Sequence, residues 1–272
     1  MTAASLDTLR RPSLRDWEPA LALVGLLMLA AMVPTAWLAL TDDRTLYGVN
    51  IWDKPLKFEL STAMFLLMAA WTFTRLPAGW RHTFAGRYVI WAAILATLFE
   101  VGYITFQASR GQASHFNFSS GFTIAMYSVM GAGAVMLTST ALVQGIGVLR
   151  HDAGDPPAFR SALGWGLVLT FLLGTFTGAY MSSQLTGHWV GGAATDAGGL
   201  PFLGWSTTGG DLRPPHFLGI HAAQILPLTA LVLLAIVPKQ ARWLTTLAIL
   251  AYIALTVAVF VQAVSGLPLL AL

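Results

Sequence analysis

Residues 121–148, GFTIAMYSVMGAGAVMLTSTALVQGIGV, decide the fold, because they carry no charged side chain over their whole length. An apolar stretch of about 20 residues can cross the hydrocarbon core of a bilayer as a helix. Only 10% of the chain is charged, 56% is hydrophobic and the mean hydropathy is +0.68, whereas a soluble domain carries about 25% charged residues. The composition therefore indicates an integral membrane protein.

Six further apolar stretches accompany this one, so the sequence predicts an all-α bundle of seven transmembrane helices. Residues 1–18 are expected to form a short cytoplasmic tail, and residues 19–272 a single transmembrane domain with a Gly-rich outer loop at 185–215. The first apolar stretch exceeds the roughly 7–15 residues of a signal-peptide core, so we interpret it as a retained span. The predicted spans are 19–40, 57–73, 88–107, 121–148, 162–184, 217–237 and 243–264.

Basic residues gather in alternate connectors, and this pattern predicts the orientation. Positively charged connectors face the cytoplasm in membrane proteins. The rule places the N-terminus in the cytoplasm and the C-terminus outside, in a cell membrane that we expect to be a bacterial inner membrane. The residues on the predicted inner side are Arg10, Arg11, Arg15, Arg75, Arg81, Arg87, Arg150, Arg160, Lys239 and Arg242.

The composition also excludes several classes of site. There is no cysteine, which rules out disulfides, thiolate metal sites, iron–sulfur ligation and c-type haem attachment. The net charge of +3 is spread over short loops, so we expect no nucleic-acid partner. The last predicted span has no lysine, which removes the retinal-binding interpretation.

Short matches between spans suggest an internal repeat. A basic residue followed by Phe lies near the start of spans two, four and six, at 57–58, 115–116 and 216–217. Tyr103 and Gln107 near the end of span three match Tyr180 and Gln184 near the end of span five, and each pair shares one helix face. The sequence thus predicts parallel hairpin repeats (1–2, 3–4 and 5–6) followed by helix 7. Coincidence is the alternative, since aromatic and basic residues are common at membrane interfaces.

Two carboxylates within the predicted spans, Glu59 and Glu100, are the candidate catalytic residues. An ionisable side chain within a span costs several kcal/mol unless it is paired or hydrated. No Lys or Arg lies within four residues of Glu100, so Glu100 is expected to handle protons. The alternative is a structural ion pair with Lys57 or Arg110.

Three histidines on the predicted outer side are the candidate ligands for a cofactor. His115 paired with His216 or His221 could ligate haem b, and all three could contribute to a divalent metal site with nearby carboxylates. Arg110 and Arg213 are expected to hold anionic groups such as propionates. The alternative is that these residues are hydrogen-bonded structural groups or lie at the interface. Candidate substrate-binding residues complete the site: Tyr103, Gln107, Tyr180, Gln184 and Asp211.

These residues predict a polar site in the outer half of the bundle. The first hypothesis is haem b or metal binding with a redox or metal-assisted role. The second is a transporter or sensor of a small polar or anionic molecule, in which the same residues bind without chemistry. The third is a structural subunit. The expected partners are the lipid bilayer and a small-molecule ligand.

Overall fold

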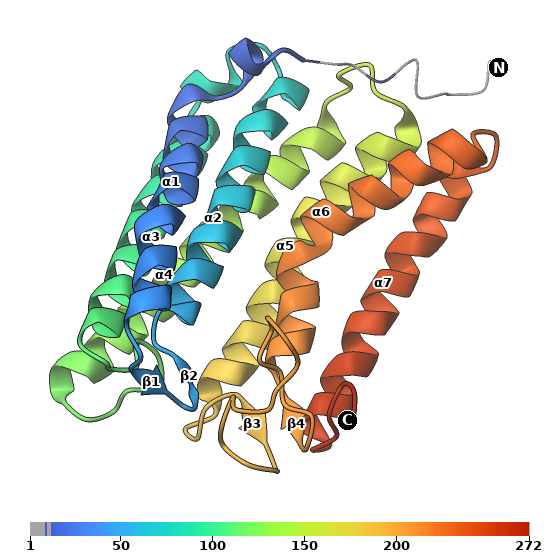
Figure 1. Cartoon of the computed structure of the whole chain (residues 1–272). Helices are drawn as coiled ribbons and strands as arrows, with labels where there is room; N and C mark the ends of the chain where they lie inside the picture. The colour runs from blue at the N-terminus through green and yellow to red at the C-terminus, as the bar shows by residue number, and fades with distance from the viewer. Residues whose placement is uncertain (1–8, 10–11, 272) are drawn as a thin grey trace.

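The computed structural model, which describes residues 9 and 12–271, confirms an all-α bundle (Figure 1). Seven helices in the described part of the chain are long and apolar enough to cross a membrane, so the chain is a multi-pass membrane protein. The helices are α1 (Pro19–Thr41), α2 (Asp53–Thr72), α3 (Phe84–Ser109), α4 (Gly121–Arg150), α5 (Pro157–Ser183), α6 (Arg213–Ile236) and α7 (Ala241–Val264).

Four helices, α2, α3, α5 and α6, begin four or five residues before the predicted spans. The first turns of α2, α5 and α6 contain Asp53, Pro157 and Pro214. Acidic residues and prolines suit a first helical turn, where several backbone N–H groups lack intrahelical partners, but hydropathy does not detect them. As a result, the basic–Phe pairs at 57–58 and 216–217 lie inside helices, whereas the pair at 115–116 lies in the connector before α4. The three pairs therefore occupy different positions relative to their helices, and the repeat stays a prediction.

Small residues allow the helices to approach closely. The contact between α5 and α6 is the most extensive in the bundle. A Cβ atom on Gly166 would lie 2.8 Å from the carbonyl oxygen of Ala222, and one on Gly219 would lie 2.8 Å from the backbone nitrogen of Gly174. In lipid, close backbone packing of this kind replaces the hydrophobic driving force between helices.

One end of the bundle carries all the β structure, and we call it the capped end (Figure 1). The strands β1 (Thr45–Leu46) and β2 (Val49–Asn50) form a hairpin between α1 and α2. Its two turn residues, Tyr47 and Gly48, both have positive φ, as a type I′ turn requires. The strands β3 (Trp189–Val190) and β4 (Gly210–Asp211) pair within residues 184–212, which we call the capping loop. The capped end is the predicted outer side.

The opposite end is held together by a buried ion pair and by a helix cap. The guanidinium of Arg75, just after α2, lies 2.9 Å from the carboxylate of Asp155 in the α4–α5 connector. At the start of α1, the side chain of Glu18 accepts a hydrogen bond from the backbone of Leu21. The rest of the predicted tail includes a 3₁₀ turn at Leu14–Asp16; Arg10 and Arg11 lie outside the described residues.

Candidate functional site

The centre of the capped end is a contact between a lysine and a histidine. Lys54 lies in the first turn of α2, and its ammonium nitrogen is 3.0 Å from Nδ1 of His115 in the α3–α4 connector. Among the described residues, Lys54 forms no salt bridge. Glu100 and Asp196 act on its charge from a longer range. The site therefore holds a partly buried cation whose close partner is a neutral ring.

The hydrogen bonds of His115 determine its protonation. An ammonium group only donates, so Nδ1 accepts from Lys54, and the hydroxyl of Ser114 lies 3.1 Å from the same atom. The imidazole proton is therefore on Nε2. Burial, together with the charge of Lys54 and the interaction with His216, holds the pKa of His115 well below its usual value. His115 is thus a neutral ring whose Nε2–H is a hydrogen-bond donor.

Glu100 faces α4 and contributes an unpaired carboxylate oxygen. Its side chain is 4% exposed, and its Oε1 atom has no hydrogen-bond partner among the described residues. A Cβ atom on Gly133 of α4 would lie 2.7 Å from this oxygen. The charged group that acts on Glu100 is Lys54. Lys54, Glu100, His115 and His216 form what we call the polar cluster.

The two histidines of α6 each donate Nδ1–H to a backbone carbonyl. His216 donates to Gly174 of α5 over 3.1 Å, and its ring packs against Gly178. His221 donates to Phe217, one turn earlier in α6, over 2.8 Å and stacks on that ring. Both rings therefore present Nε2 as an acceptor. His216 interacts electrostatically with His115, which connects α6 to the polar cluster.

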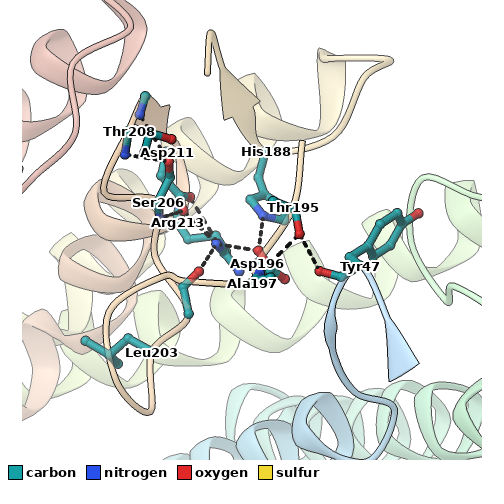
Figure 2. A network of polar contacts seen from close by, with 12 residues as sticks. Tyr47, His188, Thr195, Asp196, Ala197, Leu203, Ser206, Thr208, Asp211 and Arg213 are labelled. Carbon is teal, nitrogen blue, oxygen red and sulfur yellow. Dashed lines mark hydrogen bonds and ion pairs between the residues drawn. The ribbon is translucent and has the colours of Figure 1, made fainter. Parts of the chain in front are cut away.

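The capping loop is tied to α6 and to the β1–β2 hairpin by one network (Figure 2). Arg213 forms ion pairs with Asp196 at 2.8 Å and with Asp211 at 2.6 Å, and His188 Nε2 lies 3.3 Å from the carboxylate of Asp196. The backbone N–H of Asp196 donates to the carbonyl of Tyr47 over 2.9 Å. The charge of Arg213 is therefore neutralised by two carboxylates of the capping loop.

Two ionisable groups of the network, His188 and Asp196 of the capping loop, have lowered pKa values. Burial lowers the pKa of His188 against the opposing effect of its hydrogen bond to Asp196. Burial raises the pKa of Asp196, but the hydrogen bond from His188 and the charge of Arg213 outweigh it, so the net pKa is lowered. At neutral pH the network contains a neutral imidazole and an ionised carboxylate.

Glu59 lies apart from the polar cluster and faces α1. The Thr35 hydroxyl of α1 donates to Glu59 Oε1 over 2.8 Å, and the other carboxylate oxygen has no partner among the described residues. The side chain is 2% exposed. The contacts of Glu59 thus connect α1 to α2, and the structure does not bring it together with His115 or His216.

The remaining predicted residues separate into two groups around α3 and α5. On α3, Tyr103 is buried and stacks on Phe99, and Gln107 donates to the backbone of Ala113 over 3.4 Å. Arg110 ends this helix, exposed, with its guanidinium over Phe106.

On α5, Tyr180 contacts Phe260 of α7. Gln184 follows α5 and hydrogen-bonds locally, to the backbone of Tyr180 and to Ser183. The two Tyr–Gln pairs therefore occupy different surroundings.

A crevice opens at the capped end beside the polar cluster. It has a volume of about 360 Å³ and lies between the β1–β2 hairpin and the α3–α4 connector, with Tyr47, Gln112, Ala113 and Phe116 among its lining residues. Tyr47 and Phe116 both have φ of 54°, a conformation that is costly for bulky residues and is often kept at ligand sites. Phe116 is the chain neighbour of His115, so the crevice borders the connector that carries His115.

Sequence reasoning missed Lys54, Gly133 and Asp196 as parts of the site. The predicted partners for Glu100 were Lys57 and Arg110, whereas the charged group that acts on it is Lys54, in the first turn of α2. The hydropathy profile placed that turn outside the span. Lys54 lies three residues before the basic–Phe pair at 57–58, and this proximity was the available signal.

Among the described residues, no group of three or more His, Asp or Glu side chains is arranged to hold a metal ion. No protein-family model, no curated protein sequence and no solved structure matches this chain. The residues of the capped end are therefore the basis for assigning a function to this multi-pass membrane protein.

Proposed function

We propose that the polar cluster binds a small anionic molecule, and that the protein acts as a transporter or sensor of that molecule. The observation that carries the proposal is the 3.0 Å contact between Lys54 Nζ and His115 Nδ1. This contact uses one N–H of the ammonium group and leaves two, and it turns Nε2 of His115 into a further donor. Ionisable groups within a membrane bundle usually mark ligand or ion pathways.

An anion fits this arrangement better than a cation does. His115 has its Nδ1 lone pair engaged by Lys54 and its other nitrogen protonated, so neither nitrogen is free to ligate a metal. The ammonium group also repels a second cation at this position. Hydrogen bonds between charged donors and anionic acceptors are about twice as strong as neutral ones, so Lys54 supplies both attraction and orientation.

The experiment is a stability screen in mild detergent at constant ionic strength. The probes are phosphate, sulfate, acetate, succinate and glutamate as sodium salts, and the readout is the unfolding temperature. A ligand at one hundred times its Kd stabilises a protein by about 2.7 kcal/mol, so one probe class is expected to raise the unfolding temperature of the wild type. If none of the five changes it beyond the salt control, the proposal of an anion site is wrong.

A second function is favoured by the tautomers of His216 and His221. Histidines that ligate a metal or haem iron almost always donate their other N–H to a carbonyl or carboxylate, and both rings do so. Haem b or a divalent metal held by these Nε2 atoms would give a redox or metal-assisted role. A visible absorption spectrum with metal analysis of the same purified sample tests this: a Soret band or bound metal that is lost in His216→Ala supports it, and a colourless, metal-free sample contradicts it.

A further inference from the structure

The carboxylate of Glu100 is placed to alter the charge of the polar cluster. Its side chain is 4% exposed, its Oε1 atom has no hydrogen-bond partner among the described residues, and no salt bridge joins it to Lys54. Tyr103, one turn further along α3, is 7% exposed, and within the described part of the chain its hydroxyl has no hydrogen-bond partner either. A buried carboxylate without hydrogen bonds is costly in free energy when it is charged. Protonation of Glu100 removes this cost.

The neighbours of Glu100 define what its protonation changes. From α2 comes Lys54, which acts on Glu100 electrostatically and contacts His115. Arg213 of α6 and Asp196 of the capping loop both act on Lys54. From α4 comes Gly133, which has no side chain. Lys54 therefore couples Glu100 to the His115 donor.

We infer that Glu100 is the proton-binding group of the anion site, that its protonation releases the charge of Lys54 for the anion, and that Gly133 keeps the space which Oε1 occupies. With Glu100 ionised, the carboxylate offsets the ammonium group and competes with the anion. With Glu100 protonated, the charge of Lys54 is no longer offset by this carboxylate. The anion and one proton then bind together, and this coupling rests on the proposed anion site.

Gly133 and Gly131 on α4 provide a matched pair for the steric part of the inference. A Cβ atom on Gly133 would lie 2.7 Å from Glu100 Oε1, whereas one on Gly131 meets nothing within 4 Å. Both changes add one methyl group to the same helix. Only Gly133→Ala should displace the carboxyl group.

The first test uses infrared difference spectroscopy of the purified protein during a pH titration without any ligand. The carbonyl stretching band of a protonated carboxyl group should appear as pH falls, disappear in Glu100→Gln and persist in Glu59→Gln. Gly133→Ala should shift the frequency or midpoint of this band, and Gly131→Ala should leave both unchanged. A band that persists in Glu100→Gln overturns the assignment of the proton; equal behaviour of the two glycine variants overturns the role of Gly133.

The second test measures the Kd of the stabilising probe anion as a function of pH. Linkage of one proton to one anion weakens binding by up to about tenfold for each pH unit above the titration of Glu100. Glu100→Gln should bind with an affinity that does not vary with pH, and Glu59→Gln should follow the wild type. A wild-type affinity that is independent of pH overturns the coupling. If no probe binds while the infrared band still titrates, the anion function fails and the proton site stands.

Discussion

At the residue scale, the carboxylates of Glu59 and Glu100 within the spans have different surroundings. Glu59 receives a hydrogen bond from Thr35 and lies between α1 and α2, whereas Glu100 has no hydrogen bond among the described residues and lies near a lysine. The sequence predicted both as unusual because both interrupt apolar stretches. It singled out Glu100, which has no Lys or Arg within four residues. It could not identify the partners of either carboxylate, because these come from other helices and hydropathy carries no information on which faces meet.

Removal of the Thr35 hydroxyl tests the structural role of Glu59. Thr35→Val should destabilise the protein by about 1–3 kcal/mol, because a buried carboxylate loses its donor. The control is Thr41→Val in the same helix, where the exposed hydroxyl bonds only the carbonyl of Trp37. Thermal unfolding in detergent measures both variants, and equal losses of stability would refute the role assigned to Thr35.

At the element scale, the capping loop is expected to loosen in acid. The pKa values of His188 and Asp196 are both below their ordinary values in the folded loop. The open loop therefore binds more protons, and its closed form loses stability as pH falls. The loss begins below pH 6.5, the ordinary value for His188, and Asp196 adds to it below pH 3.8.

Hydrogen exchange of residues 184–212 measures this opening. Protection is expected to decrease between pH 7 and pH 5, after correction for the intrinsic exchange rate, while α5 and α6 stay protected. In Asp196→Asn the loop should already exchange faster at pH 7, because the ion pair with Arg213 and the contact with His188 are lost. Protection that does not change with pH in the wild type would contradict the role of this network.

The buried ion pair at the opposite end gives a second prediction at this scale. Asp155→Asn should destabilise the bundle by about 3–5 kcal/mol, since it leaves the buried charge of Arg75 without its carboxylate. Asp152→Asn in the same connector is the matched control: Asp152 pairs with Arg160, but its side chain is 68% exposed, so the loss should be about 0–1 kcal/mol. Similar unfolding temperatures for both variants would show that the connector does not depend on Arg75 and Asp155.

At the scale of the whole molecule, composition and hydropathy predicted the seven-helix fold, and the structure confirms it. They placed the starts of α2, α3, α5 and α6 four or five residues too late. The first turns of α2, α5 and α6 contain Asp53, Pro157 and Pro214 instead of apolar residues. Because of this error, the sequence did not place Lys54 in a helix, whereas the first turn of α2 holds its ammonium group next to His115. The predicted site residues at the capped end therefore did not include Lys54, which contacts His115 there.

The absence of cysteine makes the predicted orientation testable with single thiols. Ser119→Cys lies exposed at the capped end and Ala78→Cys lies exposed at the opposite end. A membrane-impermeant maleimide applied to intact cells should label Ser119→Cys, and should label Ala78→Cys only after lysis. The reverse pattern would place the polar cluster on the cytoplasmic side.

Binding of the probe anion to Lys54→Met and Lys57→Met is the most direct measurement of the proposed site. Both lysines lie in the first two turns of α2, but Lys57 is exposed and, among the described residues, its ammonium hydrogen-bonds only the carbonyl of Leu203, at 3.4 Å. Each variant is compared with its own ligand-free unfolding temperature, so a change in basal stability does not affect the result. We predict that Lys57→Met keeps the anion-induced stabilisation and that Lys54→Met loses it. Stabilisation of equal size in Lys54→Met and in the wild type would contradict the assignment of Lys54 and His115 as the anion site.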